Sequence, residues 1–313
     1  MFESICKNKY WRLLQPEASI ILLLYILVGG YLANSNLLLG NFLMVSLPVI
    51  FVSFLASLLD TIGDKKSDKE LAKKTGKESD NPLASGEIKG NRYLLFAPFL
   101  TLLFFISAYY MWNNILLVIV LFLTYFFVSL IYSFNPRISD MSILGNITFM
   151  LFLVYVPIIL GSYLAMGEVP MLMPIIAFPI FLIMLIVDIT KDVSYIDKDI
   201  LTSRNSIVKK FGSIAMRFVA SFLFLLVFLS LLLYFFIDLH YIYLFIVLLS
   251  FGILLPYFYE IRILSLRLKN LDVTEDFVEN NSTFIKPVKN LYKKSIFLGG
   301  FVYPLALILG LTL

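Results

Sequence analysis

Residues 170–192 read PMLMPIIAFPIFLIMLIVDITKD. No charged residue occurs in this stretch before Asp188, so the uncharged run approaches the ~20 apolar residues that a helix needs to cross a bilayer. Asp188 ends the run, and Lys191 and Asp192 follow about one helical turn later. Because an ionisable residue is costly in a strongly apolar run of this kind, the carboxylate of Asp188 is a candidate functional group.

The remainder of the chain repeats this pattern of long apolar runs. Hydrophobic residues make up 60% of the 313 residues and charged residues only 15%, with a mean hydropathy of +0.91. A soluble domain has about 45–50% apolar and about 25% charged residues, so the composition excludes an ordinary soluble protein. The apolar runs predict nine membrane-spanning helices, near residues 17–34, 40–59, 93–111, 114–133, 143–166, 170–188, 214–236, 240–260 and 295–312. We therefore expect an all-α, multi-pass integral membrane protein whose nine helices form one bundle and one domain over residues 1–313.

The positions of the basic residues test this assignment independently. All 25 Lys and Arg fall in the amino-terminal segment, or in and beside the connections that follow the second, fourth, sixth and eighth predicted spans. With nine spans these segments share one face of the membrane, and the positive-inside rule makes that face cytoplasmic. We therefore expect a cytoplasmic amino terminus and a carboxyl terminus on the opposite side. Three cytoplasmic connections are long, near residues 60–92, 188–213 and 261–294.

The rare side chains exclude several classes of function. The chain has one Cys and one His, Cys6 and His240, which excludes a disulfide framework and a metal site built from Cys or His ligands. The net charge of +4 is small. We expect membrane lipids among the partners, and no nucleic acid.

A first group of carboxylates, Asp60, Asp64 and Asp68, closes the second predicted span. The three recur at every fourth residue, so on a helix they share one face, where like charges repel each other. Oxygen ligands with no His or Cys among them suit a hard cation such as Mg²⁺, which takes further oxygens from water and phosphate. The alternative is a solvated helix end, in which nearby lysines such as Lys65 and Lys66 balance the carboxylates.

A second group closes the sixth predicted span, where Asp188, Asp192, Tyr195 and Asp199 share one helical face. Four spans separate the two groups, so both emerge on the same side of the membrane. They occupy equivalent places in two four-helix halves, with the ninth helix left over. The sequence therefore predicts that the two groups hold Mg²⁺ and a diphosphate between them.

These residues resemble the motifs of the UbiA-type intramembrane prenyltransferase superfamily, whose members have nine helices and two Asp-rich cytoplasmic motifs. The first group, followed by residues 81–86 (NPLASG), resembles the first motif and the segment after it. Residues 191–199 (KDVSYIDKD) lie over the second motif without a gap, and residues 205–212 (NSIVKKFG) lie over its continuation. Shorter resemblances occur at residues 29–33 (GGYLA), at Tyr132-Ser133, at Arg137 and at Leu144-Gly145-Asn146.

The chain departs from the family pattern at several positions. Asp60 stands where the family has Asn, and Asn81 stands where it has Arg. Gln15-Pro16 replaces an Arg-Pro pair that is common in the family, so two phosphate contacts of the family are missing. Tyr195 occupies the middle Asp position of the second motif, and Asp188, one turn before the motif, is a candidate for its replacement. These departures indicate a divergent member.

The resemblance implies Mg²⁺-dependent transfer of a prenyl group from an isoprenoid diphosphate to a lipophilic acceptor, with release of diphosphate. The implied Mg²⁺ ligands are Asp60, Asp64, Asp68, Asp188, Asp192 and Asp199. Arg137, Lys191 and Lys198 are the nearest candidates for contacts to the diphosphate. Tyr132 and Tyr195 are candidates for stabilising the allylic cation, since aromatic faces attract cations. The alternative for both tyrosines is an anchoring role at the membrane interface.

Other functions stay open at this point. A terpene cyclase of the same fold would capture the allylic cation within the donor molecule. A transporter or a non-catalytic membrane scaffold is a different class, and a transporter site is expected near the bilayer midplane rather than at one face. The acceptor can be an aromatic acid, a quinone precursor or a glycerol lipid. The 261–294 connection is either a cap over the site or a solvated loop that binds anionic lipid.

Overall fold

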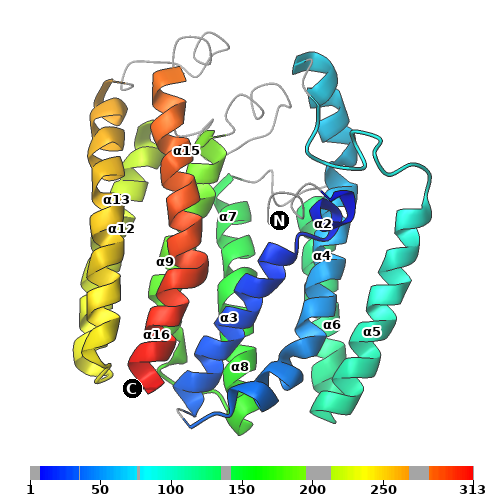
Figure 1. Cartoon of the computed structure of the whole chain (residues 1–313), viewed down its shortest axis with the longest axis horizontal. Coiled ribbons are helices and arrows are strands. Elements are labelled where there is room, and N and C mark those ends of the chain that lie inside the picture. The colour runs from blue at the N-terminus through cyan, green and yellow to red at the C-terminus, as the bar shows by residue number, and fades with distance from the viewer. Residues whose placement is uncertain are drawn as a thin grey trace. The chain divides into compact units, whose positions relative to one another are not determined.

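The structure, a computed structural model, describes residues 8–34, 36–75, 78–134, 142–194, 213–267 and 282–312. Within these residues all regular secondary structure is helical, which confirms the all-α prediction (Figure 1). The α-helices are α2 (Lys9–Leu14), α3 (Pro16–Ala33), α4 (Leu39–Thr75), α5 (Phe96–Trp112), α6 (Ile115–Ser133), α7 (Ser142–Met150), α8 (Val156–Met166), α9 (Met173–Ser194), α12 (Ser213–Phe236), α13 (Tyr241–Arg267), α15 (Ser282–Phe297) and α16 (Tyr303–Thr312). A 3₁₀ turn, η1 (Arg92–Leu95), precedes α5, and two π-helical turns, η3 (Leu151–Tyr155) and η5 (Leu298–Val302), join α7 to α8 and α15 to α16.

Each predicted span overlaps a helix, but the number nine is not confirmed. Seven segments of the described residues are long and apolar enough to cross a membrane: Pro16–Ala33, Leu39–Lys74, Tyr93–Trp112, Ile115–Ser133, Leu144–Met166, Met173–Asp192 and Asn290–Thr312. Two further apolar segments, Phe224–Phe236 and Tyr241–Pro256, are shorter. The helices therefore identify an integral membrane protein with several spans.

The helices extend further into the predicted connections than hydropathy indicates. α4 continues to Thr75, so the connection predicted to start at residue 60 begins as helix. The reason is that five of the residues between 61 and 75 are Lys, with Glu70, Leu71 and Ala72 among them, and these residue types are good helix formers. Hydropathy therefore marks the membrane boundary and not the end of the helix. The connections predicted over 188–213 and 261–294 are likewise helical where the structure describes them.

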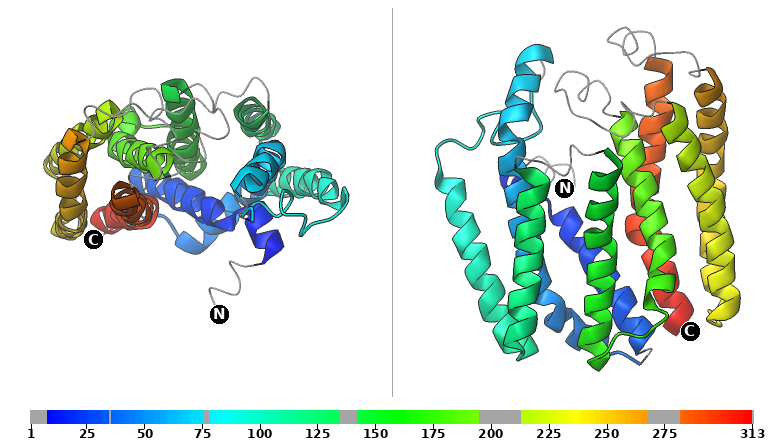
Figure 2. Two further views of the ribbon diagram at one scale, coloured as in Figure 1. Left: turned by 90° about the horizontal axis from the view of Figure 1, so that it is seen from above. Right: turned by 180° about the vertical axis from the view of Figure 1, so that it is seen from behind.

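The chain forms two compact units. Unit 1 consists of Met1–Leu23 and Leu38–Ser139, and unit 2 consists of Leu24–Leu37 and Asp140–Leu313. Helix α3 thus gives its first part to unit 1 and its second part to unit 2. In unit 1, α4, α5 and α6 lie side by side (Figures 1 and 2).

The core of unit 1 fixes the short helix α2 against α4. The side chain of Asn8 caps α2 by accepting a hydrogen bond from the Tyr10 amide (2.9 Å), and the helix ends at Gln15, whose φ of 45° is left-handed. Leu13 is fully buried and joins the core cluster of this unit. The buried residues of that cluster are Leu13, Leu55, Leu58, Leu83, Tyr93 and Leu100.

In unit 2, α3 and α8 pack closely against each other. A Cβ on Gly29 would overlap the carbonyl oxygen of Ile158, and a Cβ on Gly161 would overlap that of Ile26. Small residues permit such close approach of two backbones in membrane proteins. Next to this pair, α9 is the most buried of the seven candidate spans among the described residues, with 83% of its apolar window inside the protein.

Candidate active site

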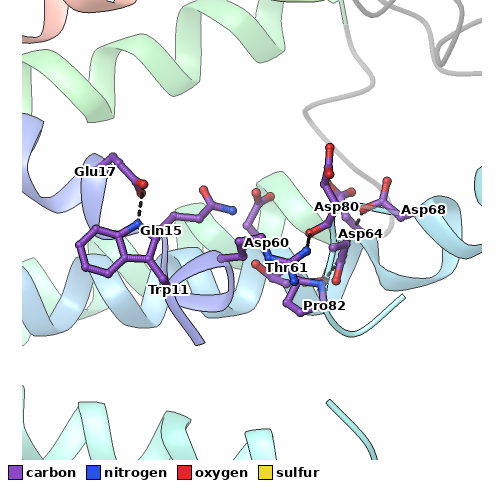
Figure 3. Close-up of a pocket in the computed structure, with 11 residues that line it drawn as sticks. Trp11, Gln15, Glu17, Asp60, Thr61, Asp64, Asp68, Asp80 and Pro82 are labelled. Atoms are coloured by element: carbon purple, nitrogen blue, oxygen red, sulfur yellow. Dashed lines mark hydrogen bonds between the residues drawn. The ribbon is translucent and has the colours of Figure 1, made fainter. Parts of the chain in front are cut away.

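The first carboxylate group lines a pocket in unit 1. The pocket has a volume of about 310 Å³, and its walls come from α2, the start of α3, α4 and residues 80–82. Its lining residues are Trp11, Arg12, Gln15, Glu17, Asp60, Thr61, Asp64, Asp68, Asp80, Asn81 and Pro82. Figure 3 shows Trp11, Gln15 and Glu17 at one end and Asp64, Asp68 and Asp80 at the other, with Asp60 between them. The structure therefore brings together the three carboxylates that were predicted from their spacing.

Asp60 is held by α6. The hydroxyl of Ser133 donates a hydrogen bond to Oδ1 of Asp60 over 2.9 Å. This contact depends on Gly63, one turn along α4, because a Cβ at Gly63 would lie only 2.6 Å from the carbonyl oxygen of Ser133. Gly63 thus lets α4 and α6 approach closely enough for the Ser133 hydroxyl to reach the first carboxylate.

We expect Gly63→Ala to separate α4 from α6 and to break the Ser133–Asp60 hydrogen bond. Overpacking of this kind destabilises a protein by about 1–3 kcal/mol, which thermal unfolding in detergent can measure. Gly40→Ala on the same helix is the matched control, because no atom lies within 4 Å of a Cβ at Gly40. Equal stability of the two variants would contradict the close approach at Gly63.

Asp68 is held by Asn81. The Asn81 side-chain amide donates to Oδ2 of Asp68 (3.1 Å) and to the carbonyl oxygen of Thr61 (3.0 Å). Its Oδ1 accepts hydrogen bonds from the amides of Leu83 (2.9 Å) and Ala84 (3.3 Å). The residue that stands at the family's Arg position therefore ties the turn after α4 to the face of α4 that carries the carboxylates.

Five lining residues of the pocket were not predicted from the sequence: Trp11, Arg12, Glu17, Thr61 and Asp80. Glu17 and Asp80 bring the carboxylates lining this pocket to five, and Arg12 is the one cation among the lining residues. The Arg12 guanidinium pairs with Glu87, outside the pocket, and this pairing lowers the pKa of Glu87 below its usual value. An excess of carboxylates in a concave site favours binding of a cation.

The second carboxylate group lies on α9 in unit 2. Asp188 and Asp192 are both buried, one helical turn apart. The side-chain amide of Asn146, also buried, donates to Oδ2 of Asp188 (2.6 Å) and to Oδ2 of Asp192 (3.4 Å). Asn146 comes from α7, in the Leu-Gly-Asn segment. An Asn amide therefore orients carboxylates in both groups, Asn81 in the first and Asn146 in the second.

The structure describes two of the remaining predicted site residues, Lys191 and Tyr132. Lys191 is exposed at the end of α9, and Tyr132 is half-buried on α6 beside Ser133. The predicted ligand Asp199, the predicted phosphate contacts Arg137 and Lys198, and Tyr195 lie outside the described residues.

The donor set fits Mg²⁺. Among the described residues, no three His, Cys, Asp or Glu side chains form a group that would enclose a metal ion. Mg²⁺ does not require such a cage, because it is usually bound by one or two carboxylates, by water and by the phosphates of a substrate. An amide orients Asp68 in the first group and both Asp188 and Asp192 in the second, so each group offers the one or two carboxylates that Mg²⁺ requires.

Comparisons with known proteins identify the same kind of protein. A model described as the UbiA prenyltransferase family matches residues 22–271. No curated protein matches the chain.

Several solved structures share the fold. A structure from work on a digeranylgeranylglyceryl phosphate synthase in membranes is 19% identical, covers 97% of this chain and 98% of its own, and has a TM-score of 0.64. A UbiA homolog from Archaeoglobus fulgidus bound to DMAPP and Mg²⁺ is 20% identical, with 95% and 99% coverage and a TM-score of 0.54. The same homolog bound to GPP and Mg²⁺ is 19% identical over 95% and 99% of the two chains, with a TM-score of 0.54.

Proposed function

Because the chain belongs to the UbiA prenyltransferase family and is therefore a prenyltransferase, we propose that it transfers a prenyl group from an isoprenoid diphosphate to a lipophilic acceptor and releases diphosphate. Mg²⁺ is the proposed cofactor. The structures of the A. fulgidus homolog with DMAPP or GPP and Mg²⁺ support this class of donor and metal.

The observation that carries the proposal is the anchoring of both carboxylate groups by neutral side chains. Asn81 orients Asp68, and Asn146 orients Asp188 and Asp192. Amide donors fix the carboxylate positions without adding a positive charge, so their oxygens keep the negative charge that a hard cation needs. We propose that activity requires both groups.

The proposed Mg²⁺ ligands are Asp60, Asp64, Asp68, Asp188, Asp192 and Asp199. Bound Mg²⁺ supplies positive charge that stabilises the leaving diphosphate. Arg137, Lys191 and Lys198 are assigned to the phosphate oxygens, which they would hold by charge-assisted hydrogen bonds. Tyr132 and Tyr195 are assigned to the allylic cation through their ring faces.

We also propose nine spans, with a cytoplasmic amino terminus and a carboxyl terminus on the opposite side. The distribution of the 25 basic residues supports this topology. It places the two carboxylate groups on the cytoplasmic side, where soluble isoprenoid diphosphates would reach them.

Product analysis tests the proposed reaction. Purified protein is incubated with labelled donors of different prenyl length, first alone and then with aromatic acids, quinone precursors and glycerol lipids. We expect a prenylated acceptor and free diphosphate in one acceptor class. A cyclised hydrocarbon from donor alone would instead indicate a terpene cyclase, and no turnover with the whole panel would favour a transporter or scaffold.

Removal of the divalent metal is expected to abolish this turnover. A chelator such as EDTA should lower diphosphate release to the background rate, since carboxylates alone repel the leaving anion. Adding Mg²⁺ in excess of the chelator should restore the rate. Release that continues at the same rate in the chelator would contradict the proposed cofactor.

A further inference from the structure

Residues 78–91 contain no helix or strand, yet they place Asn81 against α4. The segment folds back on itself around that residue. The amides of Ala84 and Ser85 donate to the Asn81 carbonyl oxygen (3.0 and 2.9 Å), and the Ile88 amide donates to that of Pro82 (3.1 Å). We call residues 80–88 the Asn81 turn. A turn without regular structure needs contacts to the rest of the protein to hold one position.

Arg12 of α2 supplies such contacts at both ends of the Asn81 turn. Its Nη1 donates to the carbonyl oxygen of Asp80 over 3.1 Å. Its Nη2 forms an ion pair with Oε2 of Glu87. The other carboxylate oxygen of Glu87 accepts a hydrogen bond from Ser85 (3.2 Å), so both of its oxygens are used within the turn or by Arg12.

The Arg12 guanidinium has further donors besides the two that reach the turn. Nε of Arg12 is buried and has no hydrogen-bond partner among the described residues. A buried donor without a partner destabilises the folded protein, and the two Nη contacts offset this desolvation cost. A planar guanidinium can reach two acceptors in different directions, which the single ammonium of Lys does less well.

Resting on the proposed function, we propose that Arg12 is a positioning residue that, by holding Asp80 and Glu87, keeps the Asn81 turn on α4 and fixes Asp68 for Mg²⁺. The connection is continuous. Arg12 holds the turn, the Asn81 amide in the turn binds Asp68 and the Thr61 carbonyl, and Asp68 lines the same pocket as Asp60 and Asp64. Outer contacts of this kind orient metal ligands, and their loss typically lowers metal affinity about 10–100-fold.

Amide hydrogen exchange tests whether Arg12 holds the turn, without requiring activity. In Arg12→Ala and in Glu87→Gln, we expect exchange at the Leu83 and Ala84 amides to rise about tenfold, since both amides bond to Asn81. Glu87 is exposed, so Glu87→Gln serves if Arg12→Ala fails to fold. Lys89→Ala, an exposed cation in the same segment, is the matched control and should leave exchange unchanged. Unchanged exchange in Glu87→Gln and in a folded Arg12→Ala would overturn the proposal.

The Mg²⁺ dependence of diphosphate release tests whether the turn acts through Asp68. In the same variants we expect the Mg²⁺ concentration for half-maximal rate to rise about tenfold, while the rate at saturating Mg²⁺ changes little. Faster exchange with an unchanged Mg²⁺ requirement would overturn the link to Asp68. An inactive wild-type protein would count against the proposed function, and the exchange measurement would still decide whether Arg12 holds the turn.

Discussion

Asp192→Asn should slow diphosphate release roughly 100-fold or more while the protein stays folded, because removal of one charge-stabilising group slows an enzyme on that scale. Asp192 is buried, and the buried amide of Asn146 orients it together with Asp188. Asn has nearly the same size as Asp, and its side-chain oxygen can still accept the hydrogen bond from Asn146. The substitution therefore removes the negative charge and little else.

Asp238→Asn is the matched control for this variant. Asp238 lies between α12 and α13 with a φ of 55°, a left-handed conformation that Asn also adopts readily. The control should keep the wild-type rate and the wild-type melting temperature. A loss of activity in Asp192→Asn that is matched by a loss of folded protein would indicate a structural role for Asp192 and contradict the assignment as a metal ligand.

Gly29→Ala and Gly161→Ala should have the largest effects on stability. At both positions a Cβ would overlap a backbone carbonyl oxygen of the facing helix, that of Ile158 or that of Ile26. A backbone atom cannot rotate away as a side chain can, so α3 and α8 would have to separate. We expect each variant to lose more than the ~1–3 kcal/mol usual for overpacking, which corresponds to a fall in melting temperature of about 10 °C or failure to accumulate.

Gly252→Ala on α13 is the control for these two variants, because no atom lies within 4 Å of a Cβ at Gly252. It should be neutral or slightly stabilising, since Ala favours a helix over Gly by about 1 kcal/mol. Thermal unfolding of the three proteins in one detergent makes the comparison. Wild-type stability of Gly29→Ala would mean that α3 and α8 do not pack as closely as described.

The fold was predictable from the sequence where it depends on hydropathy. The uncharged run before Asp188 predicted a helix, and α9 covers it. Hydropathy failed at Asp60, where the apolar run ends but α4 continues as helix to Thr75. Whether α12 and α13 cross the membrane stays a prediction, since neither is among the seven candidate spans of the described residues.

The site was predictable where it depends on one helical face. Asp60, Asp64 and Asp68 line one pocket, which agrees with the single helical face that their spacing of four residues indicated. Arg12 was missed because it lies 68 positions from its hydrogen-bond partner Asp80, a contact that only the docking of α2 creates. The sequence did contain one signal. Gln15 stands in place of the family's Arg, and Arg12 lies about one helical turn before it.

The roles of Asn81 and Gly63 could not be predicted from spacing. The side-chain nitrogen of Asn81 bonds to Asp68, and its side-chain oxygen bonds to the Leu83 amide within the turn. A turn of this kind depends on backbone angles that the sequence alone does not specify. Gly63 matters because Ser133 of α6 lies against it. Gly63 was not among the residues predicted from the sequence, although a glycine inside a helix often has a packing reason.

The central claim is that both carboxylate groups serve one Mg²⁺-dependent release of diphosphate. Its most direct test measures diphosphate released from a labelled allylic diphosphate by the wild type, Asp64→Asn and Asp192→Asn, each with and without Mg²⁺. We predict release by the wild type only with Mg²⁺, and a loss of roughly 100-fold or more in both variants. Full activity in either folded variant, or equal release without metal, would contradict the account.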